Sequence, residues 1–161
     1  MTTLTVSLPS ATEILLSRDF DAPRALVFKA FTDPALIPRW WGPRAYTTRV
    51  DKMDLRPGGV WRYVHGSPDG AEDEHGFHGE YVEIVPLERI VYTFEWEGLP
   101  GHVVTDTAVF SDLPDGKTRL NVTSHFASAA DRDGMLQSGM ETGASESYDR
   151  MAELLVTLQS S

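Results

Sequence analysis

The sequence predicts an α+β domain in which a curved antiparallel sheet of seven strands wraps around a long C-terminal helix. Two observations lead to this fold class. Between residues 46 and 126, apolar and polar residues alternate with a period of two, in segments separated by short turn signals. From Ser128 to about Leu158, apolar residues instead recur every three or four positions, which is typical of a helix.

The first strand and two short helices precede the main part of the sheet. Residues 12–20 alternate and are expected to form this strand, with Arg18 on its otherwise apolar side. Asp21 is expected to cap the first of the two short helices. Residues 1–11 show no periodicity and are predicted to be a flexible N-terminal tail. A single domain is therefore expected over residues 12–161.

The other six strands are expected to form an antiparallel meander, because the connections between them are short and rich in glycine and proline. Asp115-Gly116 is the strongest hairpin signal among these connections, and Ser67-Pro-Asp-Gly70 is another turn signal. The strands are predicted at residues 46–55, 60–65, 77–85, 89–96, 102–111 and 117–126.

Composition narrows the possible functions. The chain has 161 residues and a net charge of −10, so binding to nucleic acids and to anionic membrane surfaces is disfavoured. The absence of cysteine excludes disulfides, thiol catalysis and thiolate metal sites. No apolar run approaches the roughly 20 residues that span a bilayer, and the N-terminus does not resemble a signal peptide. We therefore expect a cytoplasmic protein that does not insert into membranes.

One face of the sheet is strongly aromatic, and the helix that covers it is slim along one half. Ile90, Tyr92, Phe94 and Trp96 share a face of one strand. The first half of the terminal helix offers mainly glycine, alanine and serine to this face, whereas its second half is rich in leucine. Because a twisted sheet does not follow a straight helix along its whole length, a cavity is predicted. The alternative is a tight contact between helix and sheet.

The cavity is expected to bind a small apolar or aromatic molecule. Of the adjacent Trp40 and Trp41, one is expected to anchor the core and the other to form the wall or the gate of the cavity. For any single aromatic residue of the strands, a place in the core is favoured over a place in the cavity lining. The predicted ligand-binding residues are Trp40, Trp41, Trp61, Tyr63, Tyr81, Tyr92, Phe94, Trp96, Met140, Gly143, Ala144, Ser147 and Tyr148.

No catalytic residue, metal site or cofactor is predicted. The stretch from Gly143 to Ser147 superficially suggests a nucleophile elbow, but it lacks the closing glycine and lies within a helix. A cluster of histidines and carboxylates matches neither a helical His-x-x-x-His pair nor a calcium-binding loop, so a solvated acidic hairpin is expected, with a divalent-metal site as the alternative. His75 and His78 are expected at the surface or in a loop. The cluster consists of His65, Asp69, Glu72, Asp73, Glu74, His75 and His78.

Several stretches, taken together and in order, resemble the lipid-transfer-like and pollen-allergen-like helix-grip superfamily (START/SRPBCC type). Within it, the chain is similar to the branch named after the activator of the ninety-kilodalton heat-shock protein ATPase. The resemblance implies a strand, two short helices, six strands and a long helix around a cavity for lipids, polyketides, hormones or other apolar molecules. The stretches are Arg18-Asp-Phe-Asp-Ala-Pro23, Val27-Phe-Lys-Ala-Phe-Thr-Asp-Pro34, Arg39-Trp-Trp-Gly-Pro43, Asp54-Leu-Arg-Pro-Gly-Gly59, Gly79-Glu-Tyr-Val-Glu83, Glu88-Arg-Ile-Val-Tyr-Thr-Phe94 and Lys117-Thr-Arg-Leu120.

The resemblance also carries one departure and two alternative functions. The family often places a tryptophan after the glycine of the last helix, whereas Gly143 is followed here by Ala144. If that tryptophan fills the cavity in relatives, its absence enlarges the cavity here. The alternatives to a ligand-binding domain are a co-chaperone-like module that acts on a chaperone, and an enzyme of the polyketide cyclase or dehydratase type. The oligomeric state is not predicted.

Overall fold

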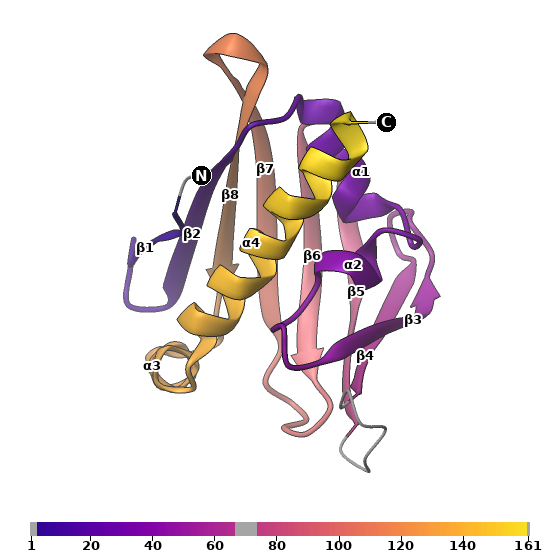
Figure 1. Ribbon diagram of the computed structural model, residues 1–161. Helices are drawn as coiled ribbons and strands as arrows, with labels where there is room; N and C mark the ends of the chain where they lie inside the picture. Colours follow the sequence, from indigo (N-terminus) through magenta and orange to yellow (C-terminus); the bar gives the residue numbers. More distant parts are fainter. Residues whose placement is uncertain (1–2, 67–73, 161) are drawn as a thin grey trace.

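The computed structural model describes residues 3–66 and 74–160 and contains one antiparallel sheet of eight strands that curves around the long helix α4 (Figure 1). The strand order is β1-β2-β8-β7-β6-β5-β4-β3. The strands are β1 (Thr5–Ser7), β2 (Glu13–Phe20), β3 (Thr47–Met53), β4 (Val60–Gly66), β5 (His75–Val85), β6 (Arg89–Trp96), β7 (Val104–Leu113) and β8 (Lys117–His125).

The helices lie on the concave side of this sheet or at its margins. After β2, the short helices α1 and α2 lead the chain across to β3 at the opposite edge, as Figure 1 shows. The predicted α+β helix-grip architecture is confirmed, with one strand more than the predicted seven. The helices are α1 (Arg24–Thr32), α2 (Ile37–Trp40), α3 (Ala129–Gln137) and α4 (Met140–Gln159), and η1 (Pro114–Gly116) is a single 3₁₀ turn.

The additional strand, β1, falls within the segment that was predicted to be a flexible tail. It pairs with the outer edge of β2, where Thr5 lies opposite Ser17 and Ser7 lies opposite Leu15. An edge strand exposes unpaired backbone N–H and C=O groups, and a short extended segment satisfies them without any periodic side-chain pattern. The expectation of a tail over residues 1–11 is therefore wrong for residues 5–7.

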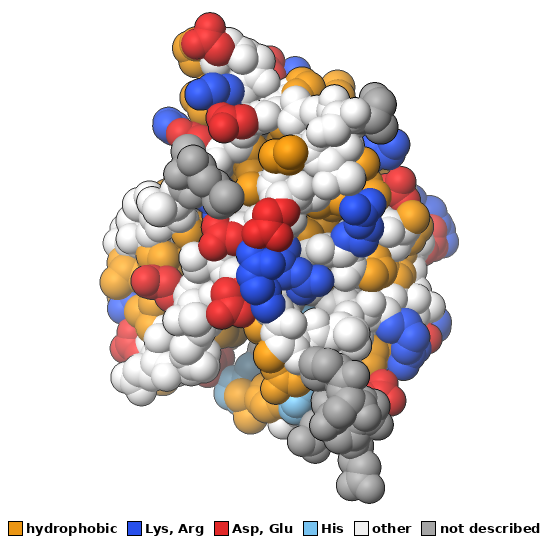
Figure 2. Space-filling view, viewed as in Figure 1, with side chains coloured by type: hydrophobic (Ala, Val, Ile, Leu, Met, Phe, Trp, Pro, Cys, Tyr) orange, Lys and Arg blue, Asp and Glu red, His pale blue; other side chains and the backbone are white. Residues whose placement is uncertain are grey.

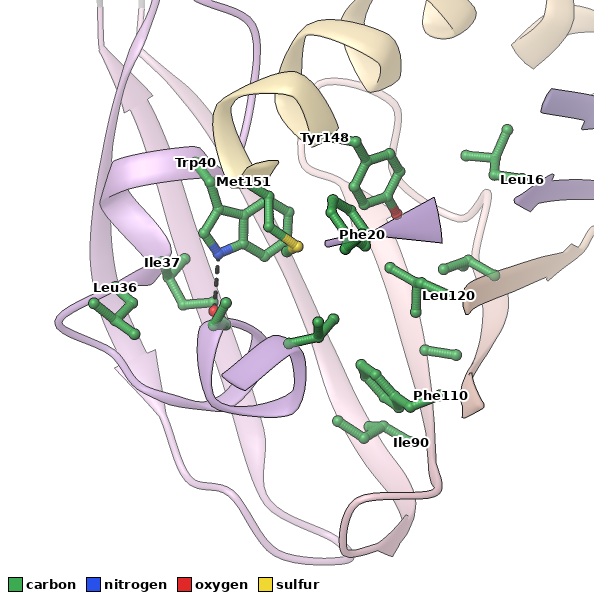
Figure 3. Close-up of a cluster of buried hydrophobic side chains, with 14 of the residues drawn as sticks. Leu16, Phe20, Leu36, Ile37, Trp40, Ile90, Phe110, Leu120, Tyr148 and Met151 are labelled. Atoms are coloured by element: carbon green, nitrogen blue, oxygen red, sulfur yellow. Dashed lines mark hydrogen bonds between the residues drawn. The ribbon is translucent and has the colours of Figure 1, made fainter. Parts of the chain in front are cut away.

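The core lies between the concave face of the sheet and the second half of α4. In β2, the alternating residues predicted to face inward are buried, and Ile14 and Phe20 are almost completely inaccessible. From α4, Met151 and Leu155 pack against them (Figure 3). The leucine-rich half of α4 thus forms an ordinary well-packed core, as its sequence predicts.

The starts of the helices differ in how they are capped. The side-chain cap expected at Asp21 is wrong, because α1 begins at Arg24 and its N-cap, Pro23, has no side chain that could accept a hydrogen bond. At the other end of the chain, the Ser128 side chain accepts a hydrogen bond from the Asp131 backbone N–H at 3.1 Å, as a capping residue should. The helical segment expected from Ser128 to about Leu158 is interrupted at Gly139, which has a φ of 85° and separates α3 from α4.

The hairpin between β7 and β8 is confirmed at Asp115-Gly116. Both residues have positive φ angles, 66° and 72°, as this sequence favours in tight turns. Leu113 and Lys117 close the hairpin as its last paired residues. The other predicted turn, Ser67-Pro-Asp-Gly70, lies outside the described residues.

A buried ion pair joins β2 to α4. Arg18, which the alternation of β2 places on the apolar side, is 2% exposed, and its Nη1 donates to Asp149 Oδ1 at 2.8 Å. The guanidinium also lies over the Phe20 ring, 5.4 Å from its centroid. A charged group is tolerated on this face because it reaches a carboxylate at the margin of α4.

Replacing Asp149 with alanine should therefore destabilise the protein by about 2 kcal/mol, because it removes the carboxylate that compensates a buried cation. Urea denaturation at pH 7 measures this loss. Asp112→Ala is a matched control, since Asp112 pairs with Arg24 at 3.4 Å on the surface and should contribute no more than about 0.5 kcal/mol. Equal losses for the two variants would contradict this role of Arg18 and Asp149.

Candidate ligand-binding cavity

A cavity of about 270 Å³ lies beneath the first half of α4. Its walls come from the concave face of the sheet, from α2 and the connection that follows it, and from α3 and α4. Every residue predicted from the sequence to line a cavity lies in this wall, except Trp96. The half-buried Trp41, Pro43, Met135 and Met140 mark the side on which the cavity is partly open.

Trp96 continues the alternation of β6 but lies at the end of the strand, beyond the wall of the cavity. It follows Ile90, Tyr92 and Phe94 on the same face of β6, and those three residues line the cavity. Trp96 is the last residue of the strand, is 39% exposed, and contacts the His75 ring at 6.2 Å between centroids. Alternation alone predicts the face of a residue, but not how far along the strand the cavity extends.

The small residues of α4 lie where the cavity is. Gly143, Ala144 and Ser147 all line it, whereas Leu154 and Leu155, about two to three turns further on, are buried in the core. A methyl group added at Gly143 would meet only Pro43 Cγ, at 3.6 Å. The slim half of the helix therefore leaves space above the sheet, as the sequence predicts.

Trp40 and Trp41 divide between core and cavity. Trp40 is 2% exposed, its Nε1 donates to the Ala30 carbonyl at 2.8 Å, and its ring stacks on Tyr148 with centroids 6.1 Å apart (Figure 3). Trp41 is half-buried and makes edge contacts with Tyr63 and Phe77, at 5.0 and 5.2 Å. Trp40 thus anchors the core while it also touches the cavity, and Trp41 forms the wall near the opening.

The connection between α2 and β3 is held against α4 by polar contacts. The Ser147 hydroxyl donates to the Trp40 carbonyl at 3.0 Å and accepts from the Gly42 N–H at 3.1 Å. The Arg150 guanidinium donates to the Gly42 carbonyl at 2.9 Å. On the surface above, Arg44 pairs with Glu153, where Figure 2 shows basic and acidic side chains together over α4. These contacts fix the rim of the cavity next to Trp41.

Several lining residues were not predicted, and the alternation of the strands could have identified them. Phe77 lies on the inner face of β5, and Asp106 and Ser124 lie on the inner faces of β7 and β8. Asp106 follows Val104 and precedes Ala108 and Phe110 at intervals of two, and those three are buried. A carboxylate at an inward position of an otherwise apolar strand was the signal that sequence reasoning missed.

Among the described residues that line the cavity, His65 is the one with a basic side chain. Its Nε2 is buried without a hydrogen-bond partner in the described part of the chain, and burial lowers its pKa to about 4. The ring is therefore neutral at physiological pH. It packs against Gly42, which has a φ of 96° and where a Cβ would collide with Nε2, so glycine is required there on both counts.

The Asp106 carboxylate lies in the middle of a row of polar side chains across three neighbouring strands. Its backbone partners are Tyr92 on β6 and Ser124 on β8. The Ser124 hydroxyl donates to Asp106 Oδ1 at 2.6 Å, and the Tyr92 hydroxyl faces the same carboxylate. Burial raises the pKa of Asp106 to about 6, and the hydrogen bond from Ser124 opposes part of that rise. Burial also keeps the pKa of Tyr92 well above its usual value.

This raised pKa predicts a pH-dependent stability. The unfolded carboxyl, with an ordinary pKa of 3.8, loses its proton before the folded one does, so the wild-type protein loses stability as pH rises from about 4 to about 6. Asp106→Asn removes this titration. The unfolding free energy of the variant, relative to that of the wild type, should therefore increase by about 2 to 3 kcal/mol between pH 4 and pH 8. Urea denaturation at each pH measures this difference. A difference that stays constant across this range would contradict the raised pKa.

The histidine-rich hairpin does not form a cation site within the part of the chain that the structure describes. Among residues 3–66 and 74–160, no group of three or more histidine, aspartate or glutamate side chains could hold a metal ion. His78 lies on the outer face of the sheet, where its ring contacts Glu97 at 2.9 Å and Glu95 at 3.2 Å. Asp69, Glu72 and Asp73 of the predicted cluster lie outside the described residues.

A bidentate contact from Arg62 to Glu97 completes this outer network, at 2.8 and 2.9 Å. Together with His78, it lowers the pKa of Glu97 to about 2. The network connects β4, β5 and the end of β6 on the face away from the cavity.

Among the described residues, 3–66 and 74–160, no helix is long and apolar enough to cross a membrane.

Comparisons with solved structures agree with this architecture. A protein from Rhodobacter sphaeroides superimposes with a TM-score of 0.88 at 24% identity, over 96% of this chain and 99% of that chain. Protein CV1439 from Chromobacterium violaceum gives a TM-score of 0.75 at 28% identity, over 91% and 98% of the two chains. An Hsp90 activator from Plasmodium falciparum gives 0.53 at 22% identity, over 71% and 72%.

The sequence also matches a family model over residues 21–156, which include both short helices, the sheet from β3 to β8 and nearly all of α4. A search of curated proteins gives no match. The resemblance inferred from the sequence motifs is thereby confirmed. The chain belongs to the family described as activator of Hsp90 ATPase homolog 1-like protein, a branch of the helix-grip superfamily.

Proposed function

We propose that this protein binds a small apolar or aromatic molecule in the cavity between the sheet and α4. The observation that supports the proposal is a space of about 270 Å³ with walls rich in aromatic residues, at the place where α4 carries the small residues Gly143, Ala144 and Ser147. Binding sites for small molecules are typically concave and apolar, with a few polar groups that orient the ligand. The Met135 and Met140 side chains at the opening suit a range of ligand shapes.

The size of the cavity sets the expected affinity. A ligand that buries about 300 Å² of apolar surface gains on the order of 7 kcal/mol before the costs of association. Because the costs of association are subtracted from this gain, dissociation constants no tighter than the micromolar range are expected for an apolar molecule of this size.

Titration with N-phenyl-1-naphthylamine, an uncharged dye whose fluorescence increases in apolar surroundings, tests this proposal. We expect saturable binding with micromolar or weaker affinity, and displacement of the dye by the neutral molecule indole. If the folded protein shows neither saturable binding nor displacement, the cavity does not act as a binding site and the proposal fails.

A second candidate is an action on a chaperone, which the description of the family favours. The likeness to the Plasmodium falciparum Hsp90 activator is a likeness of fold and supports this candidate only weakly. The measurement is the ATPase rate of a purified Hsp90 with this protein at saturating concentration. An unchanged rate would remove the candidate and leave the ligand-binding proposal intact.

A further inference from the structure

Asp106 gives the cavity a negative charge that no cationic side chain among the described lining residues offsets. The described wall contains one acidic residue, Asp106, and neither lysine nor arginine. His65 does not supply a positive charge, because burial lowers its pKa to about 4. A carboxylate removed from water is stable only when hydrogen bonds or an opposite charge compensate it.

The protein itself satisfies this carboxylate only in part. The Ser124 hydroxyl donates one hydrogen bond, at 2.6 Å, and the Tyr92 hydroxyl donates a second from the neighbouring strand. A carboxylate has about four acceptor positions on its two oxygens. Because Asp106 projects from the inner face of β7 into the wall of the cavity, its remaining acceptor positions are available to a molecule bound there.

The surroundings of Asp106 favour a cation over a neutral hydrogen-bond donor. Of the 26 described lining residues, 11 are phenylalanine, tyrosine or tryptophan, among them Tyr92, Phe94 and Tyr148, and the faces of aromatic rings attract cations. The net charge of the whole chain is −10, which attracts cations and repels anions at long range. Both effects favour a cationic ligand, as the negative charge of Asp106 does.

We propose that the cavity selects molecules with a protonated amine on an apolar, preferably aromatic body, and that the ammonium group binds the Asp106 carboxylate. This inference rests on the proposed function, since it assigns the class of ligand to the same cavity. The aromatic body lies between the small residues of α4 and the rings of β5 and β6. The ammonium group supplies the opposite charge that the wall lacks.

Three probes with one indole body test the inference by displacement of N-phenyl-1-naphthylamine at pH 7.5. They are tryptamine, tryptophol and indole-3-acetate, whose side chains end in an ammonium, a hydroxyl and a carboxylate group. We expect tryptamine to bind at least about 10-fold more tightly than tryptophol, and indole-3-acetate to bind most weakly.

Two substitutions on β7 complete the test. In Asp106→Asn the preference for tryptamine over tryptophol should fall below about 3-fold. Asp112→Asn removes the same charge at the exposed end of the strand, where the Asp112 carboxylate is 69% exposed, and should retain the preference. Urea denaturation verifies that both variants are folded.

The possible outcomes separate this inference from the proposed function. Equal binding of the three probes, tighter binding of tryptophol or indole-3-acetate, or an undiminished preference in Asp106→Asn would overturn the assignment of an amine ligand. So would the failure of all three probes to displace a dye that does bind. In each of these cases the cavity remains a binding site, whereas absence of dye binding overturns the proposed function itself.

Discussion

Replacing Ala144 with tryptophan should weaken the binding of N-phenyl-1-naphthylamine by at least about 30-fold. Ala144 lines the cavity from the slim half of α4, so an indole at this position would enter the space of about 270 Å³. The resemblance to the family also implies a tryptophan at this position in many relatives, so we expect the helix-grip architecture to accommodate the larger side chain. The fold should be retained, because the indole fills a cavity instead of displacing packed atoms.

The matched control places the same side chain elsewhere on the same helix. Val156 is 63% exposed, so Val156→Trp should leave dye binding within about 2-fold of the wild type. Circular dichroism and thermal unfolding monitor the folding of both variants. If Ala144→Trp is folded and binds the dye as the wild type does, the dye binds somewhere other than beneath α4.

Truncating Trp40 should cost about 4 kcal/mol of unfolding free energy, whereas truncating Trp41 should cost only about 1 to 2 kcal/mol. Trp40 is buried, donates a hydrogen bond to the Ala30 carbonyl, and packs between Phe31 and Tyr148. Its removal leaves a void and an unsatisfied carbonyl. Trp41 is half-buried at the cavity opening, where its ring already borders empty space.

Urea denaturation of Trp40→Ala and Trp41→Ala compares the two positions directly, and dye titration adds an independent measurement. Trp41→Ala should weaken dye binding several-fold while the protein remains folded, because it removes part of the wall. Equal losses of stability in the two variants, or undiminished dye binding by Trp41→Ala, would contradict the assignment of Trp40 to the core and Trp41 to the cavity.

The sequence predicted the elements and their faces because both depend on local periodicity. The alternation of Ile90, Tyr92 and Phe94 correctly assigned these side chains to the inner face of β6. The helical spacing of the C-terminal segment and its change from small residues to leucines correctly divided α4 into a half above the cavity and a half above the core. The hairpin at Asp115-Gly116, where both residues have positive φ angles, followed from a local turn signal.

Three features were beyond this reasoning because they depend on residues far apart in the chain. The pairing of residues 5–7 is decided by the free edge of β2, not by a pattern within those residues. Trp96 lies outside the cavity because the wall ends at Phe94, before the last residue of β6. The tolerance of Arg18 on an apolar face is decided by Asp149, which lies 131 positions later in the sequence.

Apart from β1, the sequence by itself therefore determined where the strands and the long helix lie and which faces of the strands are apolar, since neighbours along the chain carry that information. Only the tertiary structure decided that Tyr92, Asp106 and Ser124 form one polar row, because strand pairing brings them together from three separate segments. It also decided that the space beside them stays open. The curvature of the whole sheet and the packing of α4 against it set the volume of a cavity, and neither is encoded in any local pattern.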